Sequence, residues 1–142
     1  MFVHMEPIYT ATAVATGDGR NGHVQSTDQQ IDLDVRVPKE MGGAGGATNP
    51  EQLFAAGYAA CFHGALRLVA GKAGADHTDS EVVADVSIGD NGAGGFALAV
   101  GLEITLPHVD AEQAHQLVEQ AHQVCPYSNA TRGNVEVTLS LA

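Results

Sequence analysis

The feature of this sequence that most constrains the fold is a long, almost uniformly apolar segment that begins at residue 50. Asn49 is a favourable N-cap residue, Pro50 suits the first helical position, and Gln52 stands three residues after the cap. The pattern predicts a helix that ends near Ala70, before Gly71. Large apolar side chains occur on almost every side of this helix, so we expect it to be buried on most of its faces.

Small residues in the same helix would allow a second helix to approach closely. They stand between the larger apolar side chains and are Ala55, Ala56, Gly57, Ala59, Ala60, Gly64 and Ala65.

The residues before this helix carry the pattern of β-strands. Segment 8–16 is rich in β-branched residues and roughly alternating, and segment 31–37 alternates cleanly between apolar and polar side chains. Residues 17–22 are dense in turn formers, and 23–26 would return as the partner strand of a hairpin. The glycine-rich segment 42–46 lacks the Gly-Lys-Ser/Thr ending of a phosphate loop, so we expect a flexible connector.

The second half of the chain predicts another hairpin, an amphipathic helix and a last strand. Segments 81–88 and 95–106 are the expected hairpin strands, and 135–141 alternates again as the final strand. Asp110 is the expected N-cap of the helix, with Gln113 at the capping-box position. The prediction is a single α+β domain over the whole chain, with antiparallel sheets packed around one long central helix and a second helix.

The two cysteines are the only ones in the chain, and their surroundings differ. Cys61 lies in the middle of the first predicted helix, whereas Cys125 ends the second helix, immediately before Pro126. Burial raises the pKa of a thiol, and the negative end of a helix dipole disfavours a thiolate. A reactive Cys61 therefore needs a cation from elsewhere in the fold, and Arg20, in the turn of the first hairpin, is a candidate.

The residues alone leave three interpretations of these cysteines open. Both can be small buried hydrophobic residues, which is the commonest role of free cysteine. They can form a redox pair in which one sulfur attacks and the other resolves. A metal site would recruit His63 and His122 together with Cys61 and Cys125, but the spacings follow no known ligand pattern.

The charge of the chain limits the possible partners. Lys and Arg number 6 against 17 Asp and Glu, which gives a formal net charge of -11. Such a surface repels phosphate backbones and anionic lipid heads, so we expect neither nucleic acid nor a membrane surface as a partner. We also expect no stretch close to the ~20 apolar residues of a membrane span.

The N-terminal residues give an expectation about location. Segment Met1–Met5 lacks the basic and apolar parts of a secretory signal, and Met5 is a possible alternative start. We therefore expect a cytoplasmic protein, in which a cysteine pair is more often redox-active or metal-binding than a structural disulfide.

Two long segments resemble one known family. Residues 49–62, with Asn-Pro-Glu-Gln-Leu-Phe-Ala-Ala-Gly-Tyr-Ala-Ala-Cys-Phe, and residues 124–134, with Val-Cys-Pro-Tyr-Ser-Asn-Ala-Thr-Arg-Gly-Asn, resemble the organic hydroperoxide resistance (Ohr) branch of the OsmC/Ohr family. Segments 9–20 and 31–35 are similar to the same branch. The second long segment is the part that favours Ohr over OsmC.

The resemblance implies a cysteine-based peroxidase that reduces organic hydroperoxides to alcohols. By resemblance the peroxidatic cysteine is Cys61, the resolving cysteine is Cys125, and the active-site arginine and glutamate are Arg20 and Glu51. The family fold is an intertwined homodimer with two sites at the subunit interface. Its reductant is a dihydrolipoyl group on a lipoylated protein, so neither a dissociable cofactor nor a metal is expected.

The position of Glu51 has a geometric consequence. Glu51 precedes Cys61 by ten residues, which is about 15 Å along a continuous helix, and it points to a different face. Either the partner subunit supplies the glutamate, or the helix breaks near Gly57. We favour the partner subunit, so activity would require dimerisation.

Substrate choice and rival functions follow from the same residues. An apolar pocket would favour alkyl or lipid hydroperoxides over hydrogen peroxide, although each of its side chains also suits the core. The expected pocket residues are Leu53, Phe54, Tyr58 and Phe62. The alternatives are an OsmC-type peroxidase with a broader peroxide range and a non-catalytic binding protein that uses Cys and His. We expect Tyr127, Ser128, Asn129 and Arg132 to have a structural role around Cys125.

Overall fold

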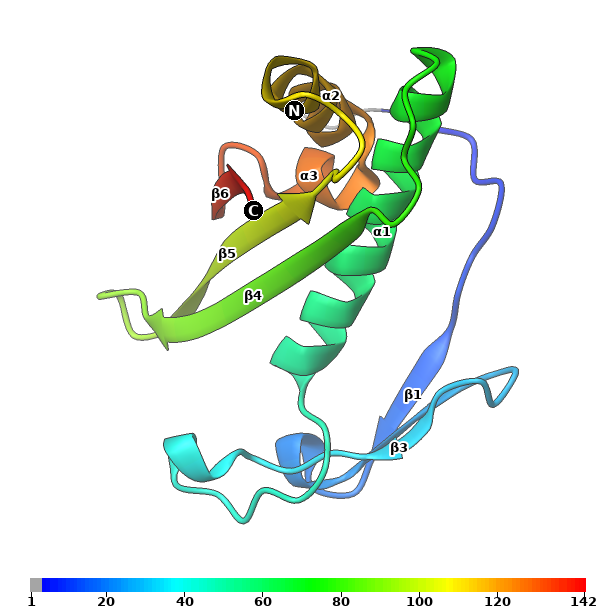
Figure 1. Cartoon of the computed structure of the whole chain (residues 1–142). Helices are drawn as coiled ribbons and strands as arrows, with labels where there is room; N and C mark the ends of the chain where they lie inside the picture. The colour runs from blue at the N-terminus through cyan, green and yellow to red at the C-terminus, as the bar shows by residue number, and fades with distance from the viewer. Residues whose placement is uncertain (1–3) are drawn as a thin grey trace. The chain divides into compact units, whose positions relative to one another are not determined.

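The computed structural model describes residues 4–142, which fall into two compact units divided between Pro50 and Glu51. Each unit contains one three-stranded sheet, and Figure 1 shows the order of the elements along the chain. Met1–Val3, on which part of the expectation about a secretory signal rests, lie outside the described residues. The single domain expected for the whole chain stays a prediction.

The first unit is built on a short antiparallel sheet. Strands β1 (Ala13–Thr16), β2 (His23–Ser26) and β3 (Asp32–Asp34) pair in the order β1-β2-β3. The predicted turn between β1 and β2 contains a single 3-10 turn, η1 (Gly19–Asn21), and a second one, η2 (Lys39–Met41), follows β3. The hairpin predicted from residues 8–26 is therefore confirmed.

The outer strands of this sheet are shorter than the sequence predicts. The ladder between β2 and β3 ends at His23 and Asp34, although the alternating pattern continues to residue 37. Val35 instead donates its backbone N–H to the carbonyl of Gly22 at 2.9 Å and forms a parallel bridge with Thr48. The alternation of apolar and polar residues indicates which face of a strand is buried. The length of the strand depends instead on how far a neighbouring strand can pair with it.

Helix α1 (Pro50–Lys72) begins where the sequence predicts and continues two residues beyond the expected end. Its buried side chains lie on one side and are Tyr58, Phe62, Ala65, Leu66, Val69 and Ala70. Small and apolar residues on the other side are exposed, namely Ala56, Ala60, Gly64, Leu68 and Gly71. Within the second unit, the expectation that most faces of this helix are buried is therefore wrong.

The apolar character of α1 also corrects an expectation about membranes. Among residues 4–142, α1 is the one helix whose length and mean hydropathy, 1.4 over an 18-residue window, would suffice to cross a membrane. The apolar character of this stretch is less evident from its large side chains, because alanine and glycine make up much of it. The central helix of a globular core passes the same test, and α1 contributes several of the side chains of the core described below.

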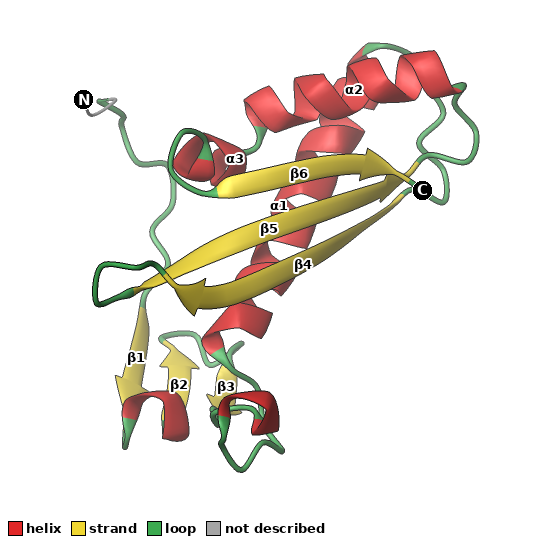
Figure 2. Ribbon diagram, turned by 90° about the vertical axis from the view of Figure 1, so that its left-hand side faces the viewer, coloured by secondary structure: helices red, strands yellow, loops and turns green. Residues whose placement is uncertain are grey.

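The second unit holds the longer sheet. Strands β4 (Glu81–Asp90) and β5 (Phe96–Thr105) form the predicted antiparallel hairpin, and β6 (Glu136–Leu141) pairs with β5 in parallel. Figure 2 shows this order, β4-β5-β6, with α1 crossing one face of the sheet. The expected α+β class is confirmed, but its last strand pair is not antiparallel, because two helices between β5 and β6 return the chain to the same end of the sheet.

Those two helices are α2 (Ala111–Val124) and α3 (Pro126–Thr131). The predicted capping box of α2 is confirmed in its main bond, since the Asp110 carboxylate accepts the Gln113 backbone N–H at 2.9 Å. Helix α2 ends before Pro126, as predicted. The sequence analysis missed α3, in which the same proline takes the first helical position, where a missing N–H costs nothing.

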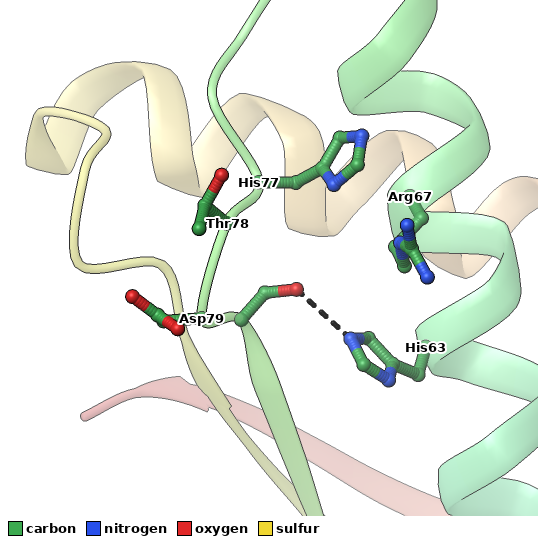
Figure 3. Close-up of a pocket in the computed structure, with 6 residues that line it drawn as sticks. His63, Arg67, His77, Thr78 and Asp79 are labelled. Atoms are coloured by element: carbon green, nitrogen blue, oxygen red, sulfur yellow. Dashed lines mark hydrogen bonds between the residues drawn. The ribbon is translucent and has the colours of Figure 1, made fainter.

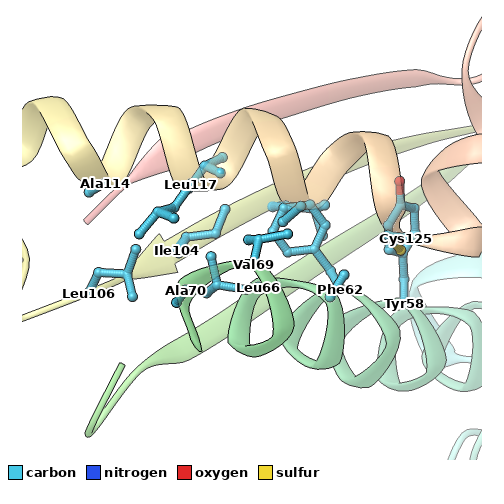
Figure 4. Packing of buried hydrophobic residues seen from close by; sticks show 14 of the residues in the cluster. Tyr58, Phe62, Leu66, Val69, Ala70, Ile104, Leu106, Ala114, Leu117 and Cys125 are labelled. Atoms are coloured by element: carbon cyan, nitrogen blue, oxygen red, sulfur yellow. The ribbon is translucent and has the colours of Figure 1, made fainter. Parts of the chain in front are cut away.

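The core of the second unit lies between α1, α2 and the inner face of the sheet. Phe62 and Leu66 of α1 meet Leu117 of α2 and Ile104 of β5, all at 2% exposure or less (Figure 4). Truncating a side chain of this kind to alanine typically destabilises a protein by about 2–5 kcal/mol. The core therefore fixes α1 against α2, the two helices that carry the cysteines.

In the first unit, one histidine bridges two strands through two carboxylates. His23 of β2 contacts Asp34 Oδ1 through Nδ1 at 2.9 Å and Asp32 Oδ1 through Nε2 at 2.5 Å. The hydrogen bonds to Asp34 and Asp32 raise the pKa of His23 above its usual value. The side chain of His23 is exposed enough for solvent to screen these contacts. We therefore expect them to affect the pairing of β2 with β3 rather than the stability of the whole protein.

We expect the pairing of β2 with β3 to weaken as pH rises from about 6.5 through the raised pKa of His23. A raised folded-state pKa adds stability that is fully present below the unfolded value, about 6.5, and is lost as pH rises through the folded value. Amide hydrogen exchange of Val24 and Leu33, corrected for intrinsic rates, should show this loss of protection. The variant His23→Gln should show no such pH dependence, and identical profiles for the two proteins would contradict the assignment.

Candidate functional site

The structure brings the two cysteines together. Cys61 lies half-buried in the middle of α1, Cys125 lies fully buried between α2 and α3, and their sulfur atoms are 3.2 Å apart. Both are free thiols. Because a disulfide bond is about 2.05 Å long, a small movement of the side chains suffices to join them.

Cys125 occupies the junction of two helices. Its backbone N–H donates to the carbonyl of Ala121 at 2.8 Å, and its own carbonyl accepts the N–H of Asn129 at 3.0 Å. The residue is extended (φ -61°, ψ 122°), as expected before a proline, because the ring of Pro126 disfavours a helical conformation there. The sequence analysis placed Cys125 only at the negative end of a helix, whereas it is also the first residue before α3.

The surroundings of Cys61 favour its neutral form. Burial raises the pKa of this thiol to about 11, and the neighbouring Cys125 also raises it, while the backbone N–H of Tyr127 donates to the sulfur and lowers it. These surroundings therefore favour the protonated thiol of Cys61 at neutral pH. This agrees with the expectation that a reactive Cys61 needs a cation from outside its own helix.

A network of buried hydroxyl groups joins α1 to α3 beside the thiols. The Tyr58 hydroxyl is 2.8 Å from Ser128 Oγ and 3.2 Å from Thr131 Oγ1. The ring of Tyr58 also packs against Tyr127, with centroids 5.6 Å apart, and both rings contact Phe54. Side chains of α1 thus hold α3 through both hydrogen bonds and aromatic contacts.

An apolar pocket of about 240 Å³ lies against the same helices. It is lined by Phe54, Tyr127, Ala130 and Thr131. Of the side chains expected to form a substrate pocket, only Phe54 lines it, since Tyr58 and Phe62 have no exposed surface and belong to the core. Tyr127 takes their place, and its position depends on α3, which the sequence pattern did not reveal.

Arg132 has the structural role around Cys125 that the sequence analysis expected. Its guanidinium donates to Asn129 Oδ1 at 2.8 Å and to the carbonyl of His122 at 2.5 Å, which links α3 to the last turn of α2. These contacts fix the two helices that meet at Cys125.

Arg20 and Glu51 lie in different parts of the chain. Arg20 is the middle residue of η1 in the first unit. Glu51 lies in the first turn of α1, and the helix is unbroken through Gly57, so the alternative of a break there is wrong. Within one copy of the chain, Glu51 is therefore about 15 Å from Cys61 along the helix axis.

The histidines considered as metal ligands do not join the thiols. His63 Nε2 is 2.9 Å from Ser80 Oγ, in a polar pocket of about 340 Å³ that holds neither cysteine (Figure 3). Burial and the charge of Arg132 lower the pKa of His122. Over residues 4–142 there is no group of three or more His, Cys, Asp or Glu side chains that could hold a metal ion.

Comparison with known proteins identifies a family and close structural relatives of the chain. The family described as "OsmC-like protein" matches residues 43–140. An organic hydroperoxide resistance protein of Xanthomonas axonopodis pv. citri is 53% identical over 137 residues, which cover 95% of each chain. A crystal structure of an organic hydroperoxide resistance protein from Legionella pneumophila superposes with a TM-score of 0.92 at 50% identity, covering 96% of this chain and 99% of that one.

A further solved structure shows a ligand in the corresponding fold. The putative organic hydroperoxide resistance protein of Vibrio cholerae has a molecule of captopril in one of its active sites. It superposes with a TM-score of 0.92 at 52% identity, covering 98% of this chain and 95% of that one. The chain therefore belongs to the OsmC/Ohr family, in its organic hydroperoxide resistance branch.

The packing of Tyr127 on α1 yields a prediction about Gly57. A methyl group at Gly57 would lie 2.9 Å from the Tyr127 hydroxyl, whereas one at Gly71 would meet nothing within 4 Å. Overpacking of this kind typically costs about 1–3 kcal/mol, and an unhindered Gly→Ala in a helix gains roughly 0.5–1 kcal/mol. Urea unfolding should therefore find Gly57→Ala less stable than Gly71→Ala, and equal midpoints would refute the close packing of Tyr127.

Proposed function

We propose that this protein is a thiol peroxidase that reduces organic hydroperoxides to alcohols through Cys61 and Cys125. The observation that carries the proposal is the pair of free thiols 3.2 Å apart, one half-buried and the other fully buried. The names of the relatives support a role in peroxide detoxification.

In the first step the Cys61 thiolate attacks the distal oxygen of the peroxide. The O–O bond breaks, the sulfur loses two electrons and becomes a sulfenic acid, and the alkoxide takes a proton and leaves as the alcohol. The half-buried Cys61 suits this step better than Cys125, which has no exposed surface. The Tyr127 N–H, which already donates to the sulfur, stabilises the thiolate.

In the second step Cys125 attacks the sulfenic sulfur, a disulfide forms between Cys61 and Cys125, and water leaves. The separation of 3.2 Å supports this condensation, since no large movement is needed. A dihydrolipoyl group then reduces the disulfide by two thiol exchanges and becomes the cyclic disulfide. A cytoplasmic location fits this scheme, because a reducing compartment keeps cysteines available as free thiols.

Arg20 supplies the missing cation in this proposal. The pKa of Cys61, raised to about 11 by burial, requires a positive charge near the sulfur if attack is to occur at neutral pH. A guanidinium also stabilises the negative charge that develops on the leaving oxygen. Glu51 orients Arg20 through the paired hydrogen bonds that a carboxylate and a guanidinium can form.

The site is shared between two copies of the chain in this proposal. Because α1 is continuous, Glu51 cannot reach Cys61 of its own helix, so the glutamate comes from the partner. The exposed Ala56, Ala60 and Gly64 of α1, with Leu68 at 50% exposure, provide a surface on which a second helix can pack closely.

The apolar pocket beside Tyr127 supports a preference for alkyl chains. Its walls are the rings of Phe54 and Tyr127 with Ala130 and Thr131, so it favours the hydrocarbon part of an organic hydroperoxide over hydrogen peroxide. Relative rates with cumene hydroperoxide and hydrogen peroxide distinguish this enzyme from an OsmC-type peroxidase of broader range.

Disulfide formation changes the intact mass of the protein. Equimolar cumene hydroperoxide, added to the reduced protein, should remove two hydrogens per chain, as intact mass under denaturing, non-reducing conditions will show. Cys125→Ser should instead gain one or more oxygens on Cys61, because its sulfenic acid has no thiol to condense with. Cys61→Ser should consume no peroxide, and unchanged peroxide consumption in that variant would refute the proposal.

The second prediction concerns mixed dimers of Glu51→Ala and Cys61→Ser chains. Each variant alone is expected to be nearly inactive, whereas refolding the two together restores sites that combine Cys61 of one chain with Glu51 of the other. About a quarter of the wild-type activity is expected, since half of randomly paired dimers are mixed and each restores one of two sites. No recovery would place both residues in one chain, and a monomer in sedimentation would exclude a shared site.

A further inference from the structure

Three buried hydroxyl groups connect the two helices that carry the thiols. Tyr58 lies three residues before Cys61 on α1, and Ser128 lies three residues after Cys125 on α3. The Tyr58 hydroxyl contacts Ser128 Oγ at 2.8 Å and Thr131 Oγ1 at 3.2 Å, and the three residues are exposed by 0%, 0% and 4%. The network therefore lies about one helical turn from the sulfur atoms on both sides.

The position of α3 determines two interactions of Cys61 at the same time. Cys125, at the start of α3, places its sulfur 3.2 Å from that of Cys61, and the backbone N–H of Tyr127 donates to the Cys61 sulfur. Helix α3 has only six residues. A displacement of this short helix from α1 would lengthen both contacts together.

Hydrogen bonds restrict the position of α3 more narrowly than apolar packing alone. Thr131 Oγ1 also donates to the carbonyl of Ser128 at 3.2 Å, so each hydroxyl has a partner in a region without solvent. These bonds are directional, and buried hydroxyl groups that lose a partner are strongly unfavourable. The network therefore favours one particular distance between α3 and α1 over shorter or longer distances.

We propose that Tyr58 is a positioning residue whose hydroxyl, through Ser128 and Thr131, holds α3 at the distance from α1 at which Cys125 reacts with oxidised Cys61. The same contact keeps the Tyr127 N–H on the Cys61 sulfur. This inference rests on the proposed peroxidase function, in which Cys125 resolves the sulfenic acid of Cys61. Tyr58 itself touches neither the peroxide nor the reacting sulfur in this scheme.

Positioning matters because the sulfenic acid has two competing reactions. Cys125 converts it into the disulfide with loss of water, and a second hydroperoxide converts it into the sulfinic acid with release of another alcohol. The second reaction inactivates the enzyme, because a thiol does not reduce a sulfinic acid. Slower attack by Cys125 therefore increases the inactivated fraction at a given peroxide concentration.

The test is the variant Tyr58→Phe, which keeps the ring and removes the hydroxyl. Rapid mixing with cumene hydroperoxide, quenching with a sulfenic-acid trap and intact mass should give a rate of disulfide formation roughly ten to a hundred times lower than in the wild type. The sulfinic fraction should rise with excess peroxide. The pH profile of Cys61 alkylation should shift to higher pH, because a thiolate that loses part of the Tyr127 hydrogen bond is less stable.

Two controls separate positioning from a general loss of stability. Ile104→Val removes one methyl group from a fully buried residue of β5, outside the hydroxyl network, and should leave the rate of disulfide formation unchanged. Ser128→Ala breaks the same network from the other helix and should act like Tyr58→Phe. The double variant should form the disulfide no more slowly than the slower single variant, since both substitutions disrupt the same hydroxyl network.

The outcomes distinguish this inference from the function on which it rests. If the wild-type protein forms no disulfide, the peroxidase proposal fails. If the wild type forms the disulfide, but both Tyr58→Phe and Ser128→Ala form it equally fast with unchanged alkylation profiles, only the role of Tyr58 is refuted. Should Tyr58→Phe fail to fold, Ser128→Ala alone decides the question.

Discussion

The burial of α1 is the constraint on which the rest of the structure depends. This helix is apolar on nearly every side, yet the sheet and α2 cover only one side of it, where Phe62 and Leu66 meet Leu117 and Ile104. The covered side fixes α1 and α2 together and thereby the depth of both cysteines. The uncovered side, with Leu68 half-exposed, is an apolar surface that the rest of the second unit leaves uncovered.

Much of the fold follows from signals that act over a few residues. Asn49 and Pro50 marked the start of α1, Asp110 and Gln113 marked the start of α2, and alternation together with turn-forming residues located the strands. What the sequence analysis missed depends on distant partners. The short β3, the parallel pairing of β6 and the fold of residues 126–131 into α3 each require a neighbour that local patterns do not specify.

The candidate site was likewise predictable only in part from the sequence. The residues alone left core, redox and metal roles open for the cysteines, because Cys61 and Cys125 are 64 positions apart and no spacing rule joins them. The family resemblance selected the pair, and the packing of α1 on α2 and α3 accounts for their proximity. The role of Tyr58 in holding α3 was not foreseen, since an apolar helix gives no reason to treat one of its aromatic residues as more than core.

Pro126 gives the site a property that is independent of its chemistry. The break between α2 and α3 arises from the proline ring, which disfavours a helical Cys125 and begins the next helix at its own position. The bend is therefore a backbone property that neither the thiol nor its oxidation state creates. In the cycle proposed above, the proline-defined bend would give Cys125 the same backbone position before and after a disulfide forms, so the sulfur could return to its starting position without refolding.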